Sequence, residues 1–65
     1  MNFSTKLKEL RLTRNLTEQQ LAELIDVSLK TYKNYEAGKT KPRIATIIKL
    51  VRALGTTSDE LLEIK

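Results

Sequence analysis

The chain has 65 residues, of which 12 are Lys or Arg, 8 are Asp or Glu and none is His or Cys, and its net charge is +4. This length suits one small domain, and the missing residue types exclude disulfides, thiolate metal sites and the commonest general base. No apolar run approaches the ~20 residues of a membrane span, and the first residues lack the apolar core of a signal peptide. We therefore expect a cytoplasmic protein of bacterial or phage origin, with no metal, no cofactor, no membrane partner and no small-molecule substrate.

Two helices are predicted in the first part of the chain. Apolar residues recur at helical spacing over about residues 4–14, and Asn15 suits the end of this helix because Asn tolerates the left-handed conformation. Thr17, with Gln20 three residues later, is typical of a capping box, which opens a second helix that runs to about Ile25.

The third predicted helix has two different faces. Ser28 can cap it, it covers about residues 29–37, and Gly38 suits its end. Tyr32 and Tyr35 share one face. Four residues lie mostly on the other faces: Leu29, Lys30, Lys33 and Asn34.

A strongly apolar fourth helix and a short fifth helix complete the pattern. Residues 39–43 are expected to form a loop, because Pro42 disfavours helix at the residue before it. The helix over about 44–54 is apolar around more than half of its circumference, which predicts a position in the middle of a bundle, packed on two sides. Thr57 and Glu60 have the spacing of another capping box, which predicts the start of the last helix. Because period-two alternation is absent, we expect an all-α fold.

The net charge is concentrated in residues 28–43. This segment holds five bases and one acid, Glu36, whereas the rest of the chain holds seven bases and seven acids. Such a concentration on a short helix and the following loop is typical of a surface that meets phosphate.

Residues 17–37 have the pattern of a helix-turn-helix, in which the second helix enters the DNA major groove. Around them the chain resembles the lambdoid phage repressor and Cro family, also called the XRE type. The matching segments are LKELR (7–11), LTEQQLA (16–22), VS (27–28), YEAGK (35–39), KP (41–42) and ALG (53–55) followed by DELL (59–62). The resemblance implies one compact five-helix, lambda-repressor-like domain over residues 1–65. It also implies a transcriptional regulator, most often a repressor, that binds a palindromic operator in double-stranded DNA as a homodimer.

The resemblance implies that Leu29, Lys30, Lys33 and Asn34 read base edges. Lysine can donate to guanine O6 and N7, Asn can pair with adenine N6 and N7, and a Leu can touch a thymine methyl. The alternative is that the two lysines belong to an ordinary solvated helix face. The resemblance and the charge also suggest six residues that contact phosphate: Gln19, Ser28, Lys39, Thr40, Lys41 and Arg43.

The family pattern further implies an ion pair between Arg11 and Glu36 that joins two helices. Three residues depart from the pattern. Asp26 stands at the turn where the family usually has Gly, and Glu18 stands where Gln commonly contacts phosphate. Arg43 is a poor residue for the start of a helix.

The last helix supplies a candidate dimer surface, Leu61, Leu62 and Ile64, because these are many apolar residues for so short a segment. We expect one of the three in the core and the remaining apolar patch to meet a partner. The alternative is that all three cap the core. A second functional hypothesis is a protein-interaction module, such as an antitoxin or antirepressor with weak DNA affinity. An enzyme is the least favoured class, because the chain has no His, no Cys and no glycine-rich phosphate loop.

Overall fold

The computed structural model describes residues 3–62, apart from the side chain of Ser58. These residues form no strand and five helices, α1 (Phe3–Thr13), α2 (Glu18–Leu24), α3 (Leu29–Ala37), α4 (Ile44–Leu54) and α5 (Ser58–Leu62). The all-α prediction is confirmed, and α3 and α4 have the predicted ends. The first helix begins and ends one residue earlier than expected, and α2 ends one residue earlier. None of the helices in this part of the chain has the length and apolar character needed to cross a membrane.

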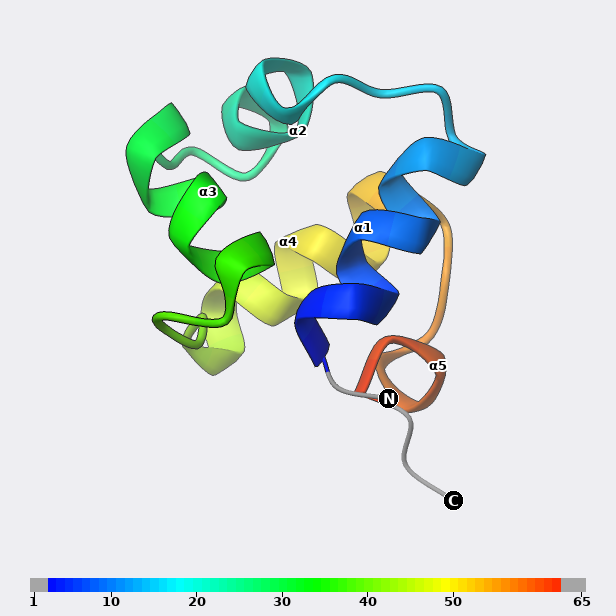
Figure 1. Ribbon diagram of the computed structural model, residues 1–65. Helices are drawn as coiled ribbons and strands as arrows, with labels where there is room; N and C mark the ends of the chain where they lie inside the picture. The colour runs from blue at the N-terminus through cyan, green and yellow to red at the C-terminus, as the bar shows by residue number, and fades with distance from the viewer. Residues whose placement is uncertain (1–2, 63–65) are drawn as a thin grey trace.

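Side chains from all five helices meet in one core. Figure 1 shows α2 and α5 at opposite ends of the molecule, with α1 and α4 between them and α3 beside α2. The first helix packs against α3 and α5, and α4 packs against α2 and α5. The buried apolar residues are Leu7, Leu21, Ala22, Ile25, Tyr32, Tyr35, Leu50, Leu54 and Leu61.

The first four helices end in the same way. A residue in the left-handed conformation follows each of them: Asn15 (φ 56°), Asp26 (φ 60°), Gly38 (φ 76°) and Gly55 (φ 63°). After α2, for example, the N–H of Asp26 donates to the carbonyl of Glu23 at 3.2 Å, and the N–H of Val27 donates to that of Ala22 at 3.0 Å. This pair of hydrogen bonds is a Schellman motif, which satisfies the last carbonyls of a helix and turns the chain sharply.

The predicted caps at the starts of α2 and α3 are present. The Thr17 hydroxyl accepts from the N–H of Gln20 at 3.0 Å, and the Gln20 side chain accepts from the N–H of Thr17 at 2.9 Å. The Ser28 hydroxyl accepts from the N–H of Thr31 at 3.1 Å. Arg43 makes no side-chain cap at the start of α4, as its residue type suggests.

The two apolar segments at the end of the chain differ from expectation. The prediction that α4 is packed on two sides is wrong for the first half of the helix, where Ile44 is 77% exposed and Ile48 is 48% exposed. Leu50 and Leu54 are buried, and Ile47, Val51 and Ala53 are partly buried against the core. The side of α4 with Ile44 and Ile48 stays uncovered.

Leu61 is fully buried and Leu62 is 36% exposed. The assignment of Leu61 to a dimer surface is therefore wrong, because its side chain fills the space between α5 and the rest of the core. Ile64 lies outside the described residues.

Candidate nucleic-acid interface

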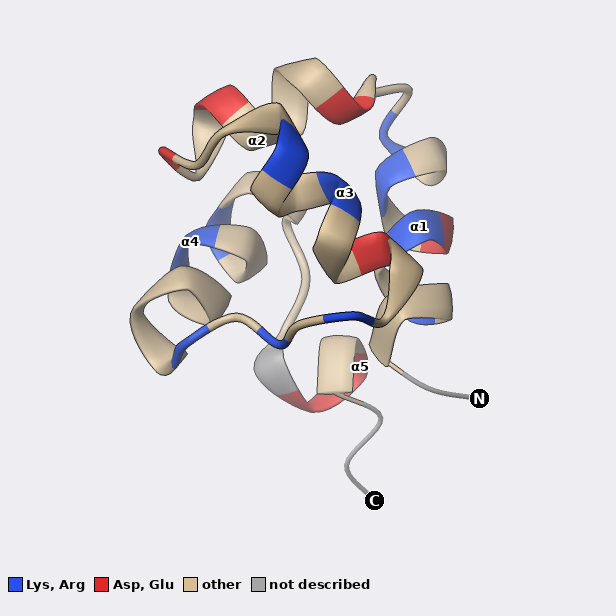
Figure 2. Cartoon of the chain, turned by 60° about the vertical axis from the view of Figure 1, so that its left-hand side comes forward, with Lys and Arg blue, Asp and Glu red and all other residues tan. Residues whose placement is uncertain are grey.

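The third helix turns one face to the core and another to solvent. Tyr32 is fully buried and Tyr35 is 8% exposed, and their rings meet edge to face with centroids 6.4 Å apart. Lys30 and Lys33 are exposed, and the two other predicted base-reading residues, Leu29 and Asn34, are half-buried. Figure 2 shows the two basic positions of α3 on the part of the helix that lies between α2 and the following loop. The helical period separates these two sets, because tyrosines three residues apart share a face.

A buried ion pair joins α3 to α1. Arg11 Nε donates to Glu36 Oε2 at 2.6 Å and its second terminal nitrogen reaches Oε1 at 3.3 Å, and both side chains are less than a tenth exposed. The remaining guanidinium nitrogen donates to the carbonyl of Leu16 at 2.8 Å. The hydrogen bond to Glu36 raises the pKa of Arg11 against the opposing effect of burial. The expected pair is present, and it holds α3 against α1 and against the segment before α2.

Tyr32 is a third member of this network that the sequence analysis missed. Its hydroxyl donates to Glu36 Oε2. Burial, followed by this hydrogen bond, raises the pKa of Tyr32 far above its usual range. The spacing of Tyr32 and Glu36, four residues apart on one helix, was the signal available in the sequence.

The turn between α2 and α3 contains Asp26, at the position where the family usually has Gly. Asp26 adopts the left-handed conformation with φ 60°, so the aspartate itself takes the backbone geometry that glycine would take. Its carboxylate accepts a hydrogen bond from Lys49 Nζ on α4 at 3.2 Å, in an exposed ion pair. Exposed pairs of this kind contribute little stability, about 0–1 kcal/mol.

The loop after α3 presents its charges to solvent. Lys39, Thr40, Lys41 and Arg43 are exposed, whereas Pro42 is buried and anchors the loop. In Figure 2 the loop crosses the same face of the molecule as α3, so the basic residues of both elements lie on one surface. We call this the basic face: Lys30, Lys33, Lys39, Lys41 and Arg43.

The other two predicted phosphate contacts make hydrogen bonds within the protein. The Gln19 side-chain amide donates to Glu23 Oε2 at 3.0 Å. The Ser28 hydroxyl caps α3 and also donates to the hydroxyl of Thr31 at 3.0 Å. Both side chains are exposed, but a phosphate would have to compete with these partners.

Two short helices joined by a tight turn, with a basic outward face on the second, define a helix-turn-helix domain. The sequence matches the helix-turn-helix family over residues 7–61. The chain therefore belongs to the XRE-type helix-turn-helix family, and its fold is that of a DNA-binding domain found in transcriptional regulators.

Known proteins resemble it over most of its length. The transcriptional repressor RstR of the cryptic phage CTXphi from Vibrio cholerae is 37% identical over 60 residues, which cover 92% of this chain and 54% of RstR. The transcriptional activator BcrR of Enterococcus faecalis is 39% identical over 62 residues, which cover 95% of this chain and 30% of BcrR. The crystal structure of the restriction-modification controller protein C.AhdI from Aeromonas hydrophila superimposes with a TM-score of 0.86 at 30% identity, covering 92% of this chain and 91% of that one.

The chain spans about half the length of curated relatives such as RstR. These relatives are transcriptional regulators, which agrees with the expectation that the chain is not an enzyme.

Proposed function

We propose that residues 1–65 act as one sequence-specific DNA-binding domain of a transcriptional regulator, with α3 in the major groove. The observation that carries this proposal is the orientation of α3. Its tyrosines are buried and its lysines are exposed, while the buried Arg11–Glu36 pair holds the helix at a defined angle to the rest of the domain. A groove about 12 Å wide admits one such helix.

In this proposal, base reading belongs to Leu29, Lys30, Lys33 and Asn34. Lysines can donate to guanine and the Asn amide can pair with adenine, each with about 1–3 kcal/mol of discrimination in a good contact. Phosphate binding belongs to Lys39, Thr40, Lys41 and Arg43, together with Gln19 and Ser28 once their internal hydrogen bonds open. Because the acid within this segment, Glu36, is neutralised by Arg11, it does not oppose an approaching phosphate.

We further propose that the domain binds a palindromic operator as a homodimer. Ile44 and Ile48 on α4, with Leu62 on α5, are large apolar side chains left exposed to solvent. Ile44 directly follows Arg43, so the apolar stripe begins where the basic face ends. Two copies on half-sites one helical turn apart, about 34 Å, would double the contacts with the duplex. Occupation of a promoter by this dimer would repress transcription, as the name of RstR states for that relative.

The test is selection of bound duplexes from a random pool, followed by titration of the selected duplex at several salt concentrations. We expect a recurrent palindromic sequence and a log–log salt slope of roughly −0.9 per phosphate contacted. Lys33→Ala should change the preferred base at one position in each half-site. Lys8→Ala, which removes an equal charge from an exposed position of α1, is the matched control and should leave the preference unchanged. A pool that yields no recurrent sequence would refute base reading by α3.

The dimer has its own test. Ile44→Glu combined with Ile48→Glu should weaken binding to the full palindrome but leave binding to an isolated half-site nearly unchanged. Sedimentation of the parent protein and of this double variant reports their oligomeric states directly. Equal affinity of both proteins for the palindrome would exclude this surface.

A protein-interaction module is the second candidate, because the start of α2 is poorly suited to phosphate. Glu18 brings a negative charge there, and the neighbouring Gln19 amide is already bound to Glu23. An interaction module would bind random duplex DNA weakly even at low salt. For a DNA reader, Glu18→Gln should strengthen binding and steepen the salt slope; unchanged affinity would mean that this side chain points away from the phosphates.

A further inference from the structure

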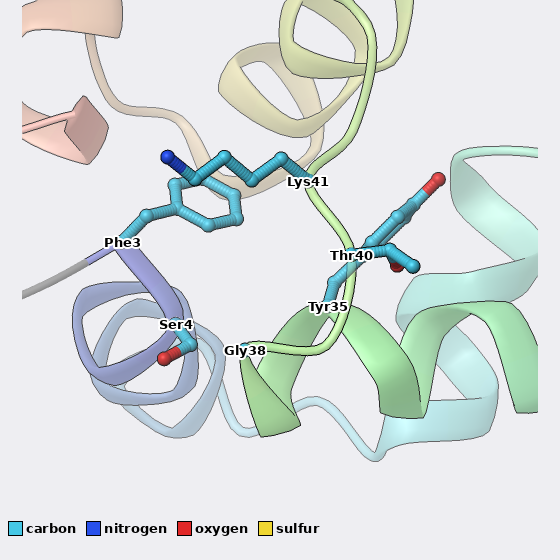
Figure 3. Close-up of a pocket in the computed structure, with 6 residues that line it drawn as sticks. All are labelled: Phe3, Ser4, Tyr35, Gly38, Thr40 and Lys41. Atoms are coloured by element: carbon cyan, nitrogen blue, oxygen red, sulfur yellow. The ribbon is translucent and has the colours of Figure 1, made fainter.

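A small cavity lies between the start of α1 and the end of α3. Its volume is about 180 Å³ and it is lined by Phe3, Ser4, Tyr35, Gly38, Thr40 and Lys41. Figure 3 shows the open centre of this group, with Phe3 on one side, Gly38 below and the Lys41 side chain extending across the top toward Phe3. The proposed DNA contacts use Lys41 and Thr40 but not the space behind them.

The cavity is built from anchored backbone. Gly38 takes the left-handed conformation, and the N–H of Lys39 donates to the carbonyl of Asn34 at 3.0 Å, which closes the end of α3. Buried Pro42 holds the other end of the loop. A ligand would therefore enter a site whose walls are already ordered, so binding would require little loss of backbone entropy.

The walls combine an apolar surface with donors for an anion. The Phe3 side chain provides an aromatic surface, and the Lys41 ammonium provides a positive charge, whereas the Tyr35 side chain runs past Thr40 and away from the open centre (Figure 3). The described residues that line the cavity include no carboxylate.

We propose that this cavity binds a small aromatic carboxylate. A cavity of about 150 Å³ lined by apolar side chains is known to accept benzene, so a volume of about 180 Å³ can hold one aromatic ring. The ring would pack against Phe3, and the carboxylate would pair with the Lys41 ammonium. A ring without charge leaves the ammonium unpaired, and a charge without a ring leaves the apolar wall empty.

This ligand would also act on DNA binding, a consequence that rests on the proposed function. Lys41 cannot pair fully with a ligand carboxylate and with a DNA phosphate at the same time. Occupation of the cavity would therefore weaken binding to every DNA sequence, since phosphate contacts carry no sequence information. The cavity would then serve as an effector site.

Benzoate is the probe for the binding experiment, with amide chemical shifts of the isotope-labelled protein as the measurement at constant ionic strength. We expect saturable shifts centred on Gly38, Thr40 and Lys41, with a dissociation constant on the order of 1 mM. Acetate, which lacks the ring, and benzamide, which lacks the charge, should each bind about tenfold more weakly. Lys41→Gln should weaken benzoate binding to a similar degree, and Lys39→Gln, which removes a charge that does not line the cavity, is the matched control.

The outcomes separate the two proposals. Benzoate shifts that do not saturate, or that Lys41→Gln leaves unchanged, would overturn the cavity proposal, as would equal binding of acetate or benzamide. In a second measurement, benzoate at its own dissociation constant should raise the apparent dissociation constant for an isolated half-site about twofold, and that for the full palindrome, which two subunits contact, up to about fourfold. An unchanged DNA affinity would overturn the effector role. A protein that binds benzoate as expected but binds no DNA would refute the proposed function and leave the cavity proposal standing.

Discussion

Arg11→Met is the substitution that most directly tests how α3 is held. Methionine keeps an unbranched side chain in the space between α1 and α3 but removes the charge and every guanidinium hydrogen bond. Glu36 would keep the Tyr32 hydroxyl as a partner and lose both contacts to Arg11. The carbonyl of Leu16 would also lose its donor.

The magnitude follows from the burial of the pair. The Arg11 and Glu36 side chains are 9% and 8% exposed, so solvent screens the remaining charge poorly. Removing one partner of a buried ion pair costs about 3–5 kcal/mol. A domain of this length has a free energy of unfolding of about 3–10 kcal/mol, at 0.05–0.15 kcal/mol per residue. We therefore expect the variant to lose about a third or more of its stability and about 15–30 °C in Tm.

Urea denaturation followed by circular dichroism measures this loss. The second variant, Arg11→Met with Glu36→Gln, removes both charges, and the neutral amide can still accept from Tyr32. It should recover about 1–3 kcal/mol of the loss, the usual coupling of residues in contact. Arg52→Met removes an exposed arginine and should change stability by less than about 0.5 kcal/mol. A loss below about 1 kcal/mol for Arg11→Met, or no recovery in the double variant, would refute this account of the pair.

Three further predictions concern the network, the turn and the basic face. The raised pKa of Tyr32 means that the stability from its protonated phenol is complete below about pH 10 and is lost as pH rises above it. Tyr32→Phe should therefore flatten the alkaline fall in unfolding free energy, whereas Tyr35→Phe should retain it; equal curves would contradict the assignment. Asp26→Ala should cost about 1 kcal/mol because alanine resists the left-handed conformation, while Asp26→Gly should stay within about 0.5 kcal/mol of the parent in urea denaturation. Lys41→Ala should weaken binding to every duplex and flatten the salt slope by about 1, whereas Lys30→Ala should mainly change the preferred base. A change of sequence preference alone in Lys41→Ala would reverse these roles.

The helix boundaries and caps were predictable because their interactions are local. Thr17 and Gln20 satisfy each other three residues apart, and Ser28 caps the helix that follows it. Glycine at position 38 ends α3 through hydrogen bonds to carbonyls of the preceding turn. These contacts depend on residue type and on spacing within one helical turn, so they can be predicted from the amino-acid sequence alone. The two faces of α3 follow from the same helical period.

The resemblance to a family supplied what spacing could not. Arg11 and Glu36 are 25 residues apart in the sequence, and nothing local pairs them. The family pattern implied their ion pair, and the structure contains it. To predict the third partner, the Tyr32 hydroxyl, one would need both the helical register of α3 and the depth at which Glu36 is buried.

Burial at the end of the chain and the shape of the surface depend on how the helices pack. Ile44 and Leu61 are both apolar, yet one is 77% exposed and the other fully buried. The amino-acid types do not distinguish them, because burial depends on whether another helix covers that side. The same holds for the cavity, whose walls come from Phe3 at the start of α1 and Lys41 in a distant loop. Local hydrogen bonds therefore specify the helices and their ends, whereas contacts between distant surfaces specify which apolar groups, charges and hollows remain open to a partner.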